Sequence, residues 1–494
     1  MLELEKIQTV KVLCVGDIML DRYLHSNVSR ISPEGPVPVA RITRTENIAG
    51  GVANVARNIA SLGAQATILG VVGDDAAGQD LENILSTERG IKTSFIVTNQ
   101  RPTTEKVRFV SRGQQLLRAD QEDATALSPD LEAQLLNLLE KEIHQYHTLV
   151  LSDYAKGVLT DKVLEKAIAL AKQHQIPVIV DPKSSDFSRY SQATVITPNA
   201  KEIFEATGIQ VNSNEDAENA GKKALQTSRA SALLITRAEQ GMSLIQKEEQ
   251  AVHIRSVAKE VFDVVGAGDT VVASLAVFLG TGRSLAEASR LANLAAGVVV
   301  GKAGTATVSL YELVEAIQQQ EMVDDPQNSI KNKITSRDEL KQLSMQWKAK
   351  GLKVGFTNGC FDLLHVGHVS LLTFARAQCD KLVIGLNSDA SVKRLKGENR
   401  PVNGETDRAY VLAALQSVDS VVIFEEDTPQ NMIEMLTPDV LIKGADYSID
   451  QIVGAQHVLA HGGRVKTFEL IPGKSSTGMI EKAKGAVHHK TPQA

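Results

Sequence analysis

The chain has few cysteines, few aromatic residues and no long apolar run. Its three cysteines, Cys14, Cys360 and Cys379, are widely spaced and form no C-x-x-C pair, so neither a disulfide framework nor a cysteine metal site is indicated. No stretch reaches the roughly 18 apolar residues of a membrane span. The first residues, MLELEKIQTVK, carry acids in place of the apolar core of a signal peptide. We therefore expect a protein of the reducing cytoplasm that contacts no membrane.

An excess of positive charge is also missing. The 494 residues include 53 Lys and Arg against 59 Asp and Glu, for a formal net charge of −6. General nucleic-acid binding needs an extended basic surface, so we expect no nucleic-acid partner and only local phosphate recognition. The hydrophobic share of 43% is that of an ordinary globular protein, and the length allows two or three domains.

Short apolar runs alternate with helical patterns along most of the chain. Leu149–Leu151 and Leu233–Ile235 indicate buried strands, whereas Ser128 precedes a proline and a run with helical spacing. This alternation predicts an α/β fold in which ligands bind beyond the carboxyl ends of the strands. Residues 37–44 and 95–117 show shorter alternating runs, for which we expect a small β lid.

The periodic pattern lapses after Ile317 into a segment rich in amides and acids. A new helix is predicted after Ser336, because Ser336 and Glu339 have capping-box spacing. Strand-like runs such as Val354–Thr357 and Leu382–Asn387 follow and indicate a second α/β domain. The predicted division is a first domain over 1–318, a linker over 319–335, a second domain over 336–482 and a disordered tail over 483–494.

The segment VGAGDT, Val265 to Thr270, combines glycines, a helix start and an acid. Val261–Val265 indicates a strand and Thr270–Phe278 a buried helix. The glycines between them let backbone N–H groups close on an anion at the helix N-terminus. Asp269 is then placed to accept a proton from an attacking hydroxyl, a contribution of roughly 10²–10⁴ in rate. Taken alone, the segment fits equally well an ordinary turn in which Asp269 caps the helix.

Glycines and short polar side chains also cluster near the start of the chain. Asp17 and Asp21 follow an apolar run, and Gly50 and Gly51 precede a helix that carries Asn54. Carboxylates and amides at such positions suit a polyhydroxy ligand, because they hydrogen-bond neighbouring hydroxyls. Ordinary turn formation explains the same residues.

The early glycine pair, the segment 199–202 and the segment 266–269 occur in the order found in the ribokinase-like sugar kinases, which residues 11–318 resemble. The resemblance implies that Asp269 is the catalytic base and that ATP and Mg²⁺ are required, Asn199 and Glu202 helping to hold Mg²⁺ indirectly. It leaves a monovalent cation open. The residues implied on the ATP side are Asn199, Ala200, Lys201, Glu202, Thr236, Gly241, Gly266, Ala267, Gly268 and Asn293. Those implied on the sugar side are Asp17, Asp21, Gly50, Gly51 and Asn54.

Four basic residues, Lys106, Arg108, Arg112 and Arg118, lie close together in the expected lid. They are compatible with a solvated strand face. Alternatively, Lys106 and Arg108 bind a phosphate already on the sugar, since arginine suits bidentate phosphate contacts. The substrate would then be a sugar phosphate.

A second motif, T-N-G-C-F-D, is followed by His365 and His368 at the start of a predicted helix, with both imidazoles on one face. A zinc site would need a third ligand, and none is evident nearby. With the preceding strand, residues 354–482 resemble the cytidylyltransferase-like nucleotidyltransferases. The resemblance implies that His365 and His368 stabilise charge on the α-phosphate. The remaining nucleotide-binding residues that it implies are Thr357, Asn358, Gly359, Phe361, Lys396, Ser476 and Thr477.

The two domains in this order, with RISPEGPVPV at 30–39, resemble the bifunctional heptose kinase and adenylyltransferases of Gram-negative bacteria. This resemblance implies phosphorylation of D-glycero-β-D-manno-heptose 7-phosphate at O1. It further implies transfer of AMP from ATP to heptose 1-phosphate, which yields the ADP-heptose of lipopolysaccharide inner core. The expected ligands are heptose phosphates and ATP, and a homo-oligomer is left open. Two alternatives remain: another sugar phosphate or CTP on the same fold pair, and a sugar-phosphate-binding regulator without catalysis.

Overall fold

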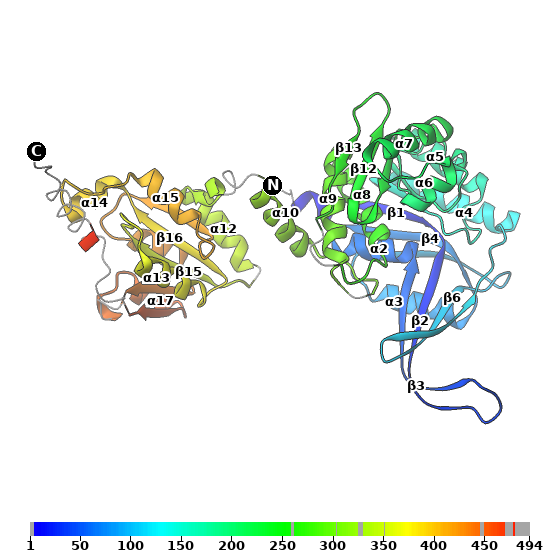
Figure 1. The fold of residues 1–494 in the computed structure, drawn as a ribbon, viewed down its shortest axis with the longest axis horizontal. Helices are drawn as coiled ribbons and strands as arrows, with labels where there is room; N and C mark the ends of the chain where they lie inside the picture. The colour runs from blue at the N-terminus through cyan, green and yellow to red at the C-terminus, as the bar shows by residue number, and fades with distance from the viewer. Residues whose placement is uncertain are drawn as a thin grey trace, which may run out of the picture. The chain divides into compact units, whose positions relative to one another are not determined.

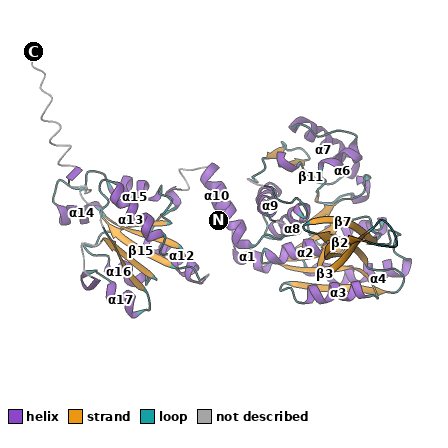
Figure 2. Ribbon diagram, turned by 60° about the horizontal axis from the view of Figure 1, so that its bottom comes forward, coloured by secondary structure: helices purple, strands orange, loops and turns teal. Residues whose placement is uncertain are grey.

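The computed structural model describes residues 4–257, 261–302, 304–324, 330–349, 351–444, 449–469 and 478–479. The chain divides into two compact units, Met1–Ile317 and Gln318–Ala494, each of the α/β class (Figures 1 and 2). The segment expected as a linker, 319–335, contains the end of α10 (Leu310–Asp324) and the strand β14 (Ile334–Thr335). The predicted tail 483–494 lies outside the described residues.

The first unit is built on a nine-stranded sheet with the order β13-β12-β11-β10-β9-β8-β1-β4-β5. Its strands from β11 to β5 pair in parallel, and β12 and β13 add an antiparallel edge. The strands are β1 (Lys11–Gly16), β4 (Gln65–Gly73), β5 (Ile91–Thr98), β8 (Thr148–Ser152), β9 (Val178–Asp181), β10 (Val195–Ile196), β11 (Ala232–Thr236), β12 (Met242–Gln246) and β13 (Val252–Ile254). The short apolar runs form parallel strands because helices cover both faces of the sheet.

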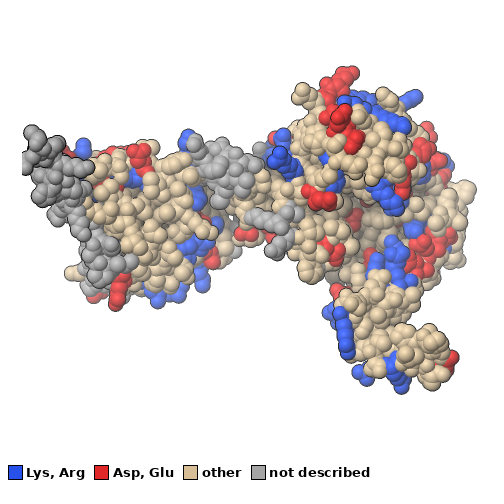
Figure 3. Space-filling view, viewed as in Figure 1, with Lys and Arg blue, Asp and Glu red and all other residues tan. Residues whose placement is uncertain are grey.

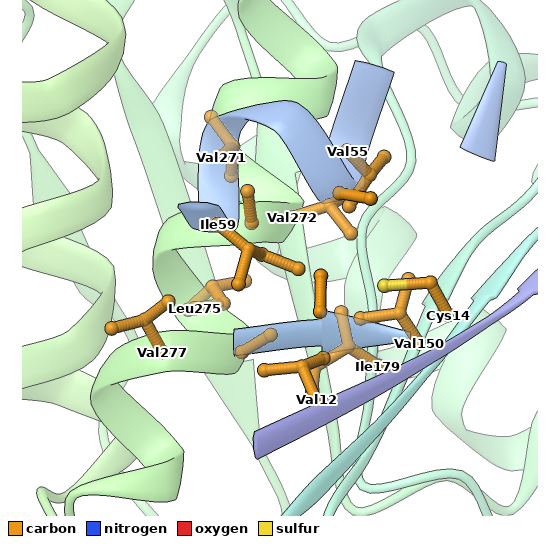
Figure 4. Packing of buried hydrophobic residues seen from close by; sticks show 14 of the residues in the cluster. Val12, Cys14, Val55, Ile59, Val150, Ile179, Val271, Val272, Leu275 and Val277 are labelled. Carbon is orange, nitrogen blue, oxygen red and sulfur yellow. The ribbon is translucent and has the colours of Figure 1, made fainter. Parts of the chain in front are cut away.

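Helices cover both faces of this sheet. Side chains of α2, α3, α8 and α9 form one apolar cluster with it, and those of α4, α5 and α7 form another. The helices are α1 (Leu4–Thr9), α2 (Val52–Ser61), α3 (Ala76–Ser86), α4 (Pro129–Glu142), α5 (Asp161–Gln173), α6 (Ala200–Thr207), α7 (Asn214–Ser228), α8 (Ala267–Gly280) and α9 (Leu285–Val299). Figure 4 shows side chains of α2 and α8 gathered with those of β1, β8 and β9 in one core. The predicted buried helix is thus confirmed as α8.

The small β element is confirmed in part. A four-stranded sheet, here called the lid sheet, has the order β3-β2-β6-β7. Its strands are β2 (Ile18–Ile31), β3 (Pro38–Gly51), β6 (Thr104–Ser111) and β7 (Gln114–Gln121), and the β2–β3 hairpin extends away from the main sheet of its unit (Figure 1). Residues 95–98, expected in this element, belong instead to β5, because they continue the parallel pairing of β4 with the main sheet.

The prediction of a strand over residues 261–265 is wrong. Residues 261–265, expected as a strand, form a loop in which Phe262 and Val264 are 75% and 64% exposed. The amides of Phe262 and Asp263 donate to the carbonyl of Val300, at 2.7 and 3.1 Å, after the end of α9. A short apolar run becomes a strand only where a sheet edge accepts its hydrogen bonds, and here the end of a helix accepts them.

The second unit has a six-stranded parallel sheet with the order β14-β17-β16-β15-β18-β19. The predicted capping box is confirmed, because the Glu339 amide donates to Ser336 Oγ and the Ser336 amide to Glu339 Oε2. The strands are β15 (Val354–Gly359), β16 (Lys381–Asn387), β17 (Ser420–Phe424), β18 (Val440–Gly444) and β19 (Arg464–Phe468). The helices are α12 (Arg337–Ala349), α13 (Val366–Arg376), α14 (Asp389–Lys396), α15 (Glu405–Ala413), α16 (Gln430–Leu436) and α17 (Ala455–Ala460).

Two features of the described residues agree with the composition: the mixture of charges on the surface and the character of the helices. On the face of the first unit that Figure 3 displays, basic and acidic side chains are interspersed. Among the residues described, none of the helices combines the length and the apolar character that crossing a bilayer requires.

Candidate active sites

The first candidate site is centred on the N-terminus of α8. Gly266 is the N-cap residue with a φ of +80°, and a Cβ there would lie 3.2 Å from Asn54 Nδ2. A glycine therefore starts this helix without strain and without crowding Asn54. Ala267 donates its amide to the carbonyl of Val264, at 3.2 Å. Gly268 has nothing within 4 Å of a Cβ position, which leaves the approach to the helix start open.

Asp269 lies in the first turn of α8 and is 8% exposed. Its carboxylate accepts hydrogen bonds from Asn54 Nδ2 at 2.6 Å and from the Tyr154 hydroxyl at 2.9 Å. Burial raises the pKa of Asp269 to about 6, and the charge of Asp21 adds to the rise while the two hydrogen bonds oppose it. A carboxylate with a pKa close to neutral suits a general base, because it is ionised at pH 7 and still accepts a proton readily.

The residues expected around the sugar divide into two kinds. Asp17 is buried, and its carboxylate accepts the backbone N–H groups of Tyr154, Lys156 and Val158 at 2.9, 3.0 and 3.2 Å. This geometry favours a role in holding the loop after β8 over direct contact with a sugar. Asp21, by contrast, lies in the lid sheet and forms an ion pair with Arg108 at 2.5 Å.

Gly50 and Gly51 are required by close packing. A Cβ at Gly50 would come within 2.3 Å of Asp21 Oδ2, and one at Gly51, whose φ is +62°, within 2.3 Å of the Asp17 carbonyl. These glycines let β3 and the start of α2 approach both acids, and α2 carries Asn54 to Asp269.

The lid sheet brings basic side chains to Asp21. Lys106 is the register partner of Asp21 across β2 and β6. Burial lowers the pKa of Lys106, the charges of Lys156 and Arg108 lower it further, and Asp21 opposes them. Two of the four basic residues, Lys106 and Arg108, therefore gather at the site. Arg112 lies in the β6–β7 turn, and Arg118, 51% exposed, pairs with Asp120. The charge of Lys156 also acts on Lys106. The sequence did not predict Lys156 as a residue of this site, because it lies on a separate loop between β8 and α5.

Except for Asn293, the residues expected on the ATP side lie next to strand ends and helix starts of the first unit. Asn199 and Glu202 form a capping box at α6, in which Asn199 Oδ1 accepts the amides of Lys201 and Glu202. Ala200 is the first residue of α6, and Asn199 forms an isolated bridge with Thr236 at the end of β11. Gly241, with a φ of +86°, would place a Cβ 2.0 Å from the Ile254 carbonyl, so it serves the chain's own packing.

Asn293 is 4% exposed, and its Nδ2 donates to the carbonyl of Arg255 at 2.9 Å. It fixes the segment after β13. The small residues Ala292, Ala295 and Ala296 lie near it on α9 and are buried in the apolar core.

The side chains around the start of α6 suit Mg²⁺ only as indirect ligands. Within the described ranges, no three side chains of His, Cys, Asp or Glu gather in a way that could hold a metal ion. Glu202 Oε2 accepts a hydrogen bond from the Asn199 amide, and Glu202 Oε1 lies 3.4 Å from Lys183 Nζ. These residues fit the indirect binding expected from the sequence, since Mg²⁺ usually keeps several waters and binds through nucleotide phosphates.

The second candidate site lies at the carboxyl end of β15. His365 is the N-cap residue of α13, and its ring stacks on His368 with centroids 3.8 Å apart. Phe361, with a φ of +42°, packs edge-on against His368 at 5.1 Å. Burial lowers the pKa of His368 to about 4, and the charges of His365 and Lys396 lower it further. His368 is therefore neutral at physiological pH, when an imidazole still has one N–H to donate.

The remaining residues of the second motif surround this pair. Thr357 is fully buried, and a Cβ on Gly359 would lie 3.1 Å from Phe361 Cε2. Asn358 Oδ1 accepts from Lys443 Nζ at 2.9 Å, which places a further cation at the end of β18 beside the motif. Lys396, the last residue of α14, is exposed. Ser476 and Thr477 lie outside the described residues.

Arg408 is a residue of this unit that the sequence analysis missed. Only 2% exposed, it donates to the carbonyls of Asn403, Cys360 and Asn387 and pairs with Asp389 at 2.6 Å. It thus ties together the segments after β15 and β16. Its signal in the sequence is slight: it lies one turn before the buried Leu412 on α15.

Replacement of this arginine tests its contribution to stability. We expect Arg408→Met to lower the free energy of unfolding of the second unit by about 3 kcal/mol, because buried carbonyl groups lose their donor. Chemical denaturation monitored in that unit measures the effect. Arg394→Met is the matched control, since Arg394 is half exposed in its ion pair with Asp427. Equal stability of the two variants would contradict the assignment.

Comparisons with known proteins identify a family for each unit. Residues 9–311 match the pfkB family of carbohydrate kinases, and residues 356–481 match the cytidylyltransferase-like family. The chain is 48% identical over 478 residues to the bifunctional protein HldE of Gluconacetobacter diazotrophicus, covering 97% of this chain and 98% of that protein. It is 49% identical over 472 residues to that of Caulobacter vibrioides, covering 95% and 96%.

Among solved structures, phosphofructokinase-2 from Escherichia coli in complex with substrates and products is similar to the first unit. It aligns with a TM-score of 0.52 and 23% identity over 62% of this chain and 98% of that one. This likeness concerns the fold.

Proposed function

Because the chain belongs to the family of the bifunctional HldE proteins, with a pfkB carbohydrate kinase followed by a cytidylyltransferase-like unit, we propose that its units catalyse two steps of ADP-heptose synthesis. The first unit is a sugar-phosphate kinase that phosphorylates D-glycero-β-D-manno-heptose 7-phosphate at O1 with ATP. The second is a nucleotidyltransferase that joins heptose 1-phosphate to AMP from ATP. The product is the heptose donor for lipopolysaccharide inner core.

One observation carries the proposal for the kinase: a buried carboxylate stands at a glycine-started helix N-terminus. Asp269 takes the proton of the heptose O1 hydroxyl as O1 bonds to the γ-phosphorus and the bond from that phosphorus to the β–γ bridging oxygen breaks. ADP leaves. Negative charge on the transferred group is met by N–H groups of the first turn of α8 and by its dipole. Lys106 and Arg108 are assigned to the 7-phosphate.

Mg²⁺ bound with ATP would neutralise charge between the β- and γ-phosphates. Asn199 and Glu202 are the residues that would hold it, through water, at the start of α6. Their capping box fixes both side chains before any ligand binds. ATP is the co-substrate in both units, and we assign both reactions to the cytoplasm, where ATP is available.

In the second unit the nucleophile is the phosphate of heptose 1-phosphate. It bonds to the α-phosphorus of ATP while the bond from that phosphorus to the α–β bridging oxygen breaks and pyrophosphate leaves. The phosphate is already ionised at neutral pH, so the site needs no strong base. His365 and His368 are assigned to the α-phosphate, with Lys396 on the leaving pyrophosphate.

Substitution of Lys106 tests the sugar-phosphate assignment. We expect Lys106→Ala to raise KM for heptose 7-phosphate about tenfold with little change in KM for ATP, because one charged hydrogen bond to phosphate is lost. Steady-state kinetics of ADP release measure it. Arg118→Ala is the control, since that side chain pairs with Asp120 at the surface. Lys106 is preferred to Arg108, whose removal would also leave Asp21 without its ion-pair partner. An unchanged KM contradicts the assignment.

Product analysis tests the function as a whole. Mass spectrometry of reactions with ATP and heptose 7-phosphate should find the 1,7-bisphosphate, and addition of a phosphatase that removes the 7-phosphate should yield ADP-heptose. Replacement of ATP by CTP, or of the heptose by other sugar phosphates, examines the alternative substrates. A regulator without catalysis would show no ATP turnover that follows the sugar phosphate.

A further inference from the structure

We propose that Tyr154 is a positioning residue for the kinase base: its hydroxyl holds Asp269 in place and favours the ionised carboxylate. This inference rests on the proposed function, in which Asp269 accepts the proton. Tyr154 lies in the loop between β8 and α5, and its hydroxyl donates to Asp269 Oδ1 at 2.9 Å. Asn54 donates to the other oxygen, Oδ2, at 2.6 Å.

Two donors from different elements fix the plane of the carboxylate. An ionised carboxylate has about four lone-pair sites, so each oxygen keeps a further site for the sugar hydroxyl. Tyr154 acts as a donor because it stays protonated: burial raises its pKa well above the usual range, and the charges of Asp269 and Asp181 raise it further. The tyrosine therefore acts through the base and has no proton of its own to exchange near neutral pH.

The loop that carries Tyr154 is itself anchored. Asp17 accepts the amides of Tyr154, Lys156 and Val158. Gly157 has a φ of +88°, and a Cβ there would lie 1.9 Å from the Thr125 carbonyl. The loop is thus held by the Asp17 carboxylate on one side and by the close approach of Gly157 to the Thr125 backbone on the other.

The charged groups around Asp269 make its ionisation depend on these donors. Asp21 from the lid sheet faces it and is paired with Arg108. Asp181 at the end of β9 also faces it, and burial together with the charges of Asp269 and Glu202 raises the pKa of Asp181 well above its usual range, Lys183 opposing. The hydrogen bonds from Asn54 and Tyr154 oppose the protonation of Asp269.

Loss of the Tyr154 hydroxyl removes a bond to the charged form, so the pKa of Asp269 rises and the base protonates at higher pH. For Tyr154→Phe we expect the acid limb of kcat/KM for the kinase to move up by about one pH unit. Activity should fall roughly fivefold at pH 6 and approach that of the unchanged protein at pH 8, with KM for ATP unaltered. Tyr146→Phe is the matched control, because its hydroxyl donates to Glu142 on α4.

A second variant keeps the test independent of any loss of packing. Tyr154→3-fluorotyrosine retains the ring and makes the hydroxyl a stronger donor, so the acid limb should move down. Asp269→Asn is measured in parallel with full-length protein. If Asp269→Asn keeps kinase activity, the proposed function of the site fails. If Asp269→Asn is inactive while both Tyr154 variants keep the original acid limb, only the positioning role is overturned.

Discussion

Asp269→Asn is expected to reduce sugar-phosphate phosphorylation by roughly 10²–10⁴, the contribution of a positioned general base, while nucleotidyl transfer proceeds unchanged. Asparagine has nearly the same shape as aspartate and keeps one oxygen, which can accept from either Asn54 or the Tyr154 hydroxyl, but it cannot accept a proton. The fold of the α8 start should survive, since Gly266 and not Asp269 is its N-cap residue. Release of ADP with heptose 7-phosphate measures the kinase, and release of pyrophosphate with heptose 1-phosphate measures the transferase.

The pH profile adds a check on the unchanged protein. Because burial raises the pKa of Asp269 to about 6, the base is ionised above that pH and protonated below it. The kinase rate, expressed as kcat/KM, should therefore decline as the pH falls through 6. A folded Asp269→Asn protein that has lost both activities would contradict separate sites, and one that retains kinase activity would remove Asp269 from its role.

The reverse result is expected for His365→Ala. Removal of a donor aimed at developing charge reduces turnover by about 10²–10³ in other enzymes, and here it also removes the ring that stacks on His368 at 3.8 Å. Adenylyl transfer should fall by at least that factor while the kinase keeps its rate. Steady-state pyrophosphate release measures the loss.

His461→Ala is the control for this prediction. His461 belongs to the same unit but lies at the C-terminal end of α17, where its ring contacts His457. It should keep both activities. Transfer that persists in His365→Ala would show that the charge on the α-phosphate is met elsewhere, and Lys443, which donates to Asn358 of the motif, is a described candidate.

Sequence patterns predicted those elements correctly that depend on residues close together in the chain. Ser128 caps α4, and Ser336 and Glu339 form their capping box before α12, because a cap depends on residues three positions apart. The predicted strand at Leu149–Leu151 is found as part of β8 for a related reason: several adjacent apolar residues between turns suit a sheet covered on both faces. Residues 261–265 show the limit, since their composition resembles that of a strand while their hydrogen bonds go to the end of α9.

The site residues divide in the same way. Asp269, His365 and His368 can be recognised in the sequence because glycines and the signals of a helix start lie within a few positions of each of them. Tyr154 and Arg408 do not, because each acts on partners from other elements: Tyr154 is 115 positions from Asp269, and Arg408 is 48 from Cys360. Their role depends on burial and on distances across the fold.

The sequence by itself determined two α/β domains in order and a phosphate chemistry for each, because helix starts, glycines and buried runs are encoded by neighbouring residues. Only the tertiary structure decided that Asp17 anchors a loop, that Asn54 and Asp269, 215 positions apart, share a hydrogen bond, and that Asp269 titrates near pH 6. The physical reason is that a pKa and a hydrogen-bond partner are set by desolvation and by contacts between distant segments, which exist only once the chain has folded.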